Sequence, residues 1–61
     1  MTASTGFYIV KRPAGTCEII PSEQFQPADP AIVEKWGPYD SAADAIARRV
    51  GLIRAGKCRP Q

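Results

Sequence analysis

The apolar pattern in the first third of the chain predicts a β-hairpin. Residues 7–12, FYIVKR, are aromatic and β-branched, which favours a strand. Residues 13–16, PAGT, combine a proline suited to the first corner of a turn with a glycine that can adopt positive φ. Residues 17–20, CEII, then predict the returning strand, which Pro21 should end. A four-residue connection between two such runs is typical of a hairpin.

Two stretches have no apolar periodicity. Residues 1–6 are small and polar, and we expect them to fray. Residues 21–31 contain three prolines and predict a long loop. Phe25 is the only large apolar side chain in that loop, so we expect it to pin the loop onto the body of the domain.

The second half of the chain predicts a third strand followed by a helix. Residues 32–36, IVEKW, alternate as a strand does, and Gly37 with Pro38 should end it because proline cannot donate to a ladder. Ser41, with Asp44 three residues later, matches a capping box and predicts where the helix begins.

The predicted helix covers residues 42–55, with Gly56 suited to the position after its end. Ala45 is small enough to let the helix lie close to the sheet. Gly51 costs about 1 kcal/mol relative to alanine inside a helix, so the alternative is a helix that ends there and a fourth strand at 52–58. We favour the longer helix. At 100° per residue its apolar side chains share an arc of about 80°: Ala42, Ile46, Val50 and Ile53.

The elements together predict an α+β fold in one small domain, residues 1–61. It consists of a three-stranded antiparallel sheet, a hairpin plus a third strand, with one C-terminal helix packed on one face. A chain of this length buries only about 60% of the surface that its unfolded form exposes. The balance between apolar burial and chain entropy is then close to zero, so such a domain usually needs a staple or a partner.

Strand alternation places large apolar side chains on both faces of the sheet, and one helix covers only one of them. Either the Phe25 loop or a second molecule must cover the rest, and an uncovered apolar patch would mark an interaction surface. Our first hypothesis is a small non-catalytic protein-interaction module, with another protein or a second copy of the chain as partner. The side chains expected to contact the partner are Tyr8, Val10, Ile20, Phe25, Trp36 and Tyr39.

Basic residues gather near the C-terminus. The net charge is +2, but residues 1–44 carry three basic and six acidic side chains, whereas residues 45–61 carry five basic ones and no acid. Cations at a helix C-terminus oppose the macrodipole, which is the interpretation we favour. The alternative is a nucleic-acid-binding protein that uses the basic helix end and tail: Arg48, Arg49, Arg54, Lys57 and Arg59. The three helical arginines point about 100° or more apart, so specific nucleic-acid binding is not expected.

Catalytic and metal-binding chemistry is sparse in this sequence. The chain has no histidine, no glycine-rich phosphate motif and only two cysteines, so we expect no enzyme, no cofactor and no metal site. The start of the chain has no basic region before an apolar run, and its longest apolar run is too short to cross a bilayer, which predicts a cytoplasmic protein without a membrane partner. Cys17 and Cys58 could form a single bridge, but a reducing cytoplasm disfavours it, so we favour two free, partly buried thiols. A thiol-based regulatory protein is the weakest alternative.

The corner between the third strand and the helix carries three resemblances. It resembles the second half of SPOR domains, which implies peptidoglycan binding. The positions that carry this resemblance are Gly37, Pro38, Tyr39, Ser41, Ala45, Leu52 and Gly56. Three strands followed by a helix with an aromatic-Asp-Ser-x-x-x-Ala entry resemble AP2-type domains, which implies DNA recognition from the sheet. The W-G-P-[FY] corner is also similar to that of short uncharacterised bacterial proteins, cyanobacterial ones in particular, a resemblance that says nothing about activity.

Overall fold

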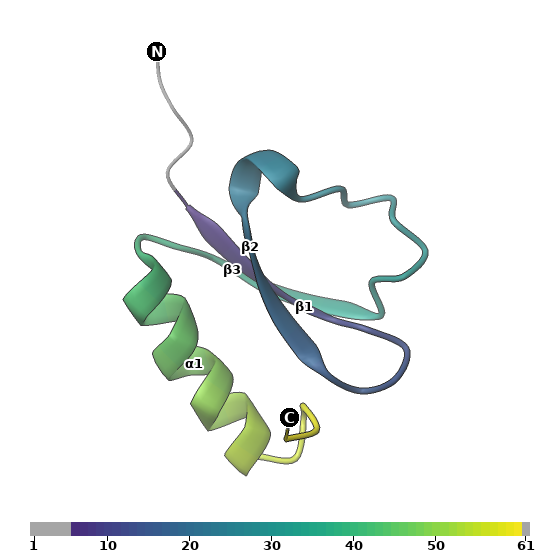
Figure 1. Cartoon of the computed structure of the whole chain (residues 1–61), viewed down its shortest axis with the longest axis vertical. Coiled ribbons are helices and arrows are strands. Elements are labelled where there is room, and N and C mark those ends of the chain that lie inside the picture. Colours follow the sequence, from purple (N-terminus) through teal and green to yellow (C-terminus); the bar gives the residue numbers. More distant parts are fainter. Residues whose placement is uncertain (1–5, 61) are drawn as a thin grey trace.

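A computed structural model describes residues 6–60 and shows a three-stranded antiparallel sheet with one C-terminal helix (Figure 1). The strands lie in the order β2-β1-β3, so β1 is central and the other two are edges. The helix contacts all three strands, which confirms the predicted α+β fold. The elements are β1 (Phe7–Lys11), β2 (Cys17–Pro21), the 3₁₀ turn η1 (Ser22–Gln24), β3 (Glu34–Tyr39) and α1 (Ala42–Arg54).

The hairpin forms as predicted, with small differences at its ends. Strands β1 and β2 pair from Phe7 opposite Pro21 to Lys11 opposite Cys17. Strand β2 therefore includes Pro21 and is one residue longer than predicted. The Arg12 amide donates to the Thr16 carbonyl over 2.8 Å and closes the turn. The fraying predicted for residues 1–6 lies mostly outside the described residues, which begin at Gly6. The carbonyl of Gly6 itself accepts a hydrogen bond from the amide of Ser22.

The predicted bounds of the third strand are wrong at both ends. Strand β3 begins at Glu34 and passes through Gly37 and Pro38 to Tyr39, with a cis peptide between that glycine and proline. Its pairing with β1 shifts register between Phe7 and Ile9, which identifies a β-bulge or similar irregularity. A proline is tolerated in a strand at the edge of a sheet and at a bulge, and β3 meets both conditions.

Helix α1 begins and ends as its local signals predict. The Ser41 side chain accepts a hydrogen bond from the Asp44 amide over 3.1 Å, which confirms the N-cap. The helix continues through Gly51 to Arg54, which confirms the longer of the two alternatives. Gly56 has a φ of +80°, the left-handed conformation expected after a helix end.

Replacement of the N-cap tests this start point. Ser41→Ala should lower the free energy of unfolding by about 1 kcal/mol, because one amide of the first helical turn loses its acceptor. Denaturant titration followed by circular dichroism measures the change. A loss below roughly 0.3 kcal/mol would contradict the role of Ser41, since caps of this kind are worth more than that.

The core lies between the sheet and α1, but the helix presents a different face from the apolar arc in its sequence. Ala45 is fully buried and Leu52 nearly so, whereas Ala42, Ile46 and Val50 are exposed. The apolar arc is therefore rotated away from the sheet. The buried cluster consists of Ile9, Cys17, Ala45, Leu52 and Cys58, with Phe7, Ile19, Trp36, Tyr39 and Ile53 packed against it.

Candidate interaction surface

The sheet face opposite α1 is covered by the chain's own loop between β2 and β3. The Phe25 ring stacks on Tyr8 with centroids 4.1 Å apart and planes inclined by 16°. The Lys35 ammonium lies 5.8 Å from the centre of the same Phe25 ring. Val10, which shares this face with Tyr8, is fully buried. The structure thus confirms that Phe25 pins the loop to the sheet.

Arg12 ties the same loop to the sheet by charge. Its guanidinium lies 3.1 Å from the Glu18 carboxylate and 3.5 Å from that of Asp29. It also donates to the Ala31 carbonyl over 3.4 Å, while the Asp29 side chain accepts from the Ala31 amide over 2.9 Å. Two contacts at separate points, one aromatic and one ionic, hold the loop against β1 and β2.

The six side chains predicted to contact a partner do not form one surface. Trp36 and Tyr39 pack against the core on the α1 side of the sheet. Val10 has no exposed surface, so its predicted role as an accessible contact is wrong. Only Tyr8, Ile20 and Phe25 remain half-buried on the opposite face. Alternation correctly predicted apolar side chains on both faces, but it could not show that the loop would cover Val10.

The apolar groups that stay accessible lie mainly on α1. In the part of the chain that the structure describes, the large exposed apolar side chains are Val33 at 60%, Ile46 at 52% and Val50 at 42%. Ile46 and Val50 are one helical turn apart on the same side, and small exposed alanines surround them. We call this surface the α1 strip; it consists of Ala42, Ala43, Ile46, Ala47 and Val50.

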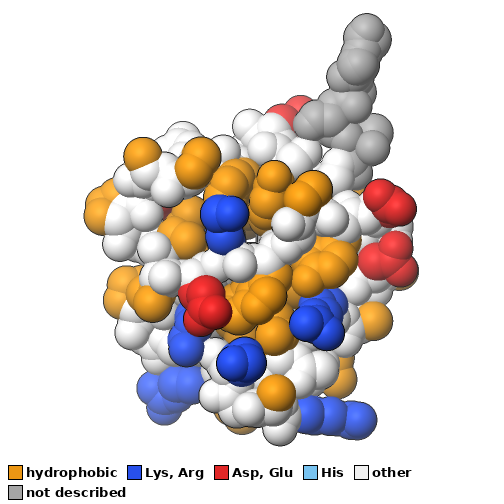
Figure 2. Space-filling view, turned by 180° about the vertical axis from the view of Figure 1, so that it is seen from behind, with side chains coloured by type: hydrophobic (Ala, Val, Ile, Leu, Met, Phe, Trp, Pro, Cys, Tyr) orange, Lys and Arg blue, Asp and Glu red, His pale blue; other side chains and the backbone are white. Residues whose placement is uncertain are grey.

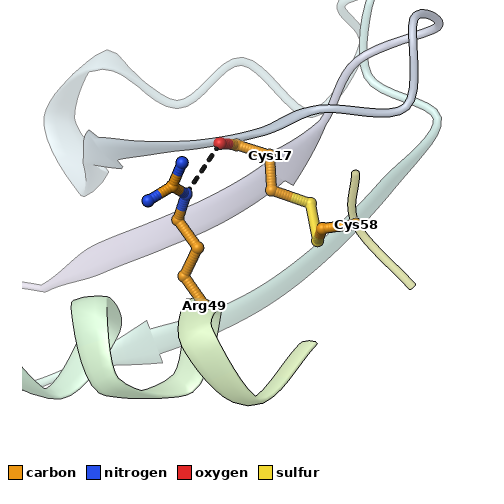
Figure 3. Close-up of a disulfide and its surroundings, with 3 residues drawn as sticks. All are labelled: Cys17, Arg49 and Cys58. Atoms are coloured by element: carbon orange, nitrogen blue, oxygen red, sulfur yellow. Dashed lines mark hydrogen bonds between the residues drawn. A yellow bond between two sulfur atoms is a disulfide. The ribbon is translucent and has the colours of Figure 1, made fainter. Parts of the chain in front are cut away.

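Two of the five basic residues proposed for nucleic-acid binding are engaged within the chain itself. Arg49 turns inward, and its Nε donates to the Cys17 carbonyl over 3.0 Å (Figure 3). Arg59 bends back onto the hairpin turn, where its guanidinium donates to the Ala14 carbonyl over 3.2 Å. On the face drawn in Figure 2, most blue side chains lie in the lower half of the view, separated by orange and white surface. Binding of an anionic partner through these residues stays a prediction.

The expectation of two free thiols is wrong. Cys17 in β2 and Cys58 beyond α1 form a disulfide, with a Cα–Cα distance of 5.7 Å (Figure 3). The turn at Gly56 directs the chain back toward β2, and the Lys57 amide donates to the Leu52 carbonyl there. The Arg59 amide then donates to the Gly15 carbonyl over 2.8 Å, beside the bridge. In this state neither cysteine is a nucleophile, and a thiol-based role would require prior reduction.

The rest of the described surface offers little for chemistry. A shallow groove runs beside β2, and its lining residues are Cys17, Glu18, Ile19 and Arg49. Residues 6–60 contain no cluster of three or more histidine, cysteine or acidic side chains that could hold a metal ion. No helix within the same range is long and apolar enough to cross a membrane.

Fold and surface together define a small disulfide-linked α+β domain with an apolar strip on its single helix. No protein-family model, curated protein or solved structure matches the chain. The resemblances to SPOR domains, AP2-type domains and short bacterial proteins therefore stay predictions.

Proposed function

We propose that this chain is a small non-catalytic protein-interaction domain, and that it contacts its partner through the α1 strip. The observation that carries the proposal is the pair of large aliphatic side chains, Ile46 and Val50, exposed one turn apart on α1. The sheet face toward α1 is covered by the helix, and the opposite face is largely covered by the Phe25 loop, where Tyr8, Ile20 and Phe25 stay half-buried. Val33 in the loop before β3 is exposed alone, whereas the helix offers two large exposed apolar side chains side by side.

The strip has the features of a modest binding site. Complete burial of an isoleucine or valine stabilises by about 1.5–3 kcal/mol, and each of these two side chains is already roughly half covered, so a partner would gain roughly 2 kcal/mol from the pair. Alanines at positions 43 and 47 allow another backbone to approach closely. Apolar side chains at the centre of an interface are typically surrounded by polar ones, and charged residues lie at both ends of α1.

Site-specific photo-crosslinking tests this function. A benzophenone amino acid at position 46 should give a discrete covalent adduct with a protein, whereas the same probe at position 33 should not. Val33 is a matched control, because it is at least as exposed but lies outside the strip. Val50→Asp should abolish the adduct at position 46, and a thermal melt should show that the variant stays folded despite a loss of about 1–2 kcal/mol from the covered half of this side chain. Equal adducts from positions 46 and 33 would count against the proposal.

A further inference from the structure

We infer that the partner on the α1 strip is a second copy of this chain, packed antiparallel along the helix. The inference rests on the proposed function and identifies the partner that binds the α1 strip. Apolar residues on this side of α1 recur at alternating intervals of three and four: Ala43, Ile46, Val50 and Ile53. This is the spacing of the seam between two packed helices. Ile53, half-buried against the core, forms the inner border of the seam.

Charge complementarity fixes the direction of packing. Asp40 and Asp44 lie at the start of α1, and Arg54 and Lys57 lie at its end. All four are exposed, and none forms a salt bridge within residues 6–60. An antiparallel copy brings the basic end of one helix beside the acidic start of the other, twice. A parallel copy would instead place like charges together at both ends.

The same arrangement fits the shapes along the strip. A two-fold axis through the middle of α1 places Val50 of one copy opposite Ile46 of the other, and Ala43 opposite Ile53. Each of these facing pairs thus joins a longer side chain with a shorter one. Helix axes pack at about 8–10 Å, which small residues such as Ala43 and Ala47 permit. A single helix strip is small for a protein interface, so the association belongs to the weak, transient class.

Charge exchange tests the arrangement by sedimentation equilibrium up to millimolar concentration. The mass of the wild type should rise from 6.6 kDa toward twice that value, and Ile46→Asp should hold it at the monomer mass. Asp40→Arg alone and Arg54→Asp alone should each weaken association about tenfold, because two attractive contacts per dimer become repulsive. An equimolar mixture of these two variants should regain the wild-type constant, since the heterodimer restores opposite charges at both ends.

Several results would overturn the inference. These are a wild type that stays monomeric at millimolar concentration, an Asp40→Arg variant that associates as well as wild type, and a mixture that fails to recover. Thermal melts of each variant establish that the fold is intact, so that loss of association is not unfolding. If the wild type is monomeric but the probe at position 46 captures a different protein, self-association fails and the proposed function stands. If neither occurs, both fail.

Discussion

Reduction of the Cys17–Cys58 disulfide is expected to lower the free energy of unfolding by about 4 kcal/mol. The bond joins cysteines 41 residues apart, so it removes much of the chain entropy of the unfolded state. Small domains have a total stability on the order of 5 kcal/mol, so the reduced chain should lie near its unfolding midpoint. Urea titration with and without a reductant, followed by circular dichroism, measures the difference.

A double variant separates the covalent bond from the reductant itself. Cys17→Ala with Cys58→Ala should unfold at nearly the same urea concentration as the reduced wild type, and added reductant should not move that midpoint. Both cysteines are buried, so alanine also leaves a small space, which lowers the midpoint slightly further. Equal midpoints for oxidised and reduced wild type, with reduction verified by mass spectrometry, would refute the stabilising role of the bond.

The disulfide also bears on where the protein works. A chain of 61 residues was expected to need a staple or a partner, and the structure contains the staple. Such bonds persist mainly in oxidising compartments, which sits uneasily with the predicted cytoplasmic location, a prediction that the structure leaves untested. Two cysteines allow only one pairing, but whether they lie close enough to bond could not be predicted, because that depends on how the turn at Gly56 directs the chain toward β2.

Features that depend on a few neighbouring residues were predictable from the sequence. The hairpin turn, the cap at Ser41 and the left-handed residue at Gly56 each follow from the local chemistry of the side chain or backbone at that position. Continuation of the helix through Gly51 was also predictable, since the loss of about 1 kcal/mol at one glycine is small beside the packing of Leu52 in the core.

The face that α1 turns to the sheet could not be predicted from periodicity. The aromatic side chains on the sheet, Trp36 and Tyr39, already supply bulk on that side. A helix packed against them needs a small residue at its closest approach, and Ala45 fills that position. Ile46 and Val50 are consequently rotated outward. This rotation is why the apolar arc in the sequence does not predict the buried face of α1, and it also leaves exposed the α1 strip on which the proposed function depends.

Gly37→Ala is expected to lower the free energy of unfolding by at least about 3 kcal/mol, because the substitution introduces both backbone strain and a steric clash. Gly37 has a φ of +122°, a conformation that residues with a Cβ rarely adopt. A Cβ built there would lie 2.9 Å from the Phe7 carbonyl oxygen and 3.2 Å from the Tyr8 ring. Because Phe7 belongs to the central strand β1, relief of the clash would disrupt the pairing of β1 with β3. Denaturant unfolding measures the loss.

Gly51→Ala is the matched control, because the same substitution should there have the opposite sign. Gly51 lies inside α1, and apart from its chain neighbours and the helix's own backbone nothing lies within 4 Å of the position of a new Cβ. Alanine at this site should raise the free energy of unfolding by up to about 1 kcal/mol, through its higher helix propensity. If Gly37→Ala were tolerated as well as Gly51→Ala, the path of β3 through Gly37 and Pro38 would be wrong, and the strand would end at Trp36. Opposite signs would instead establish that Gly37 is required by the close approach of β3 to β1.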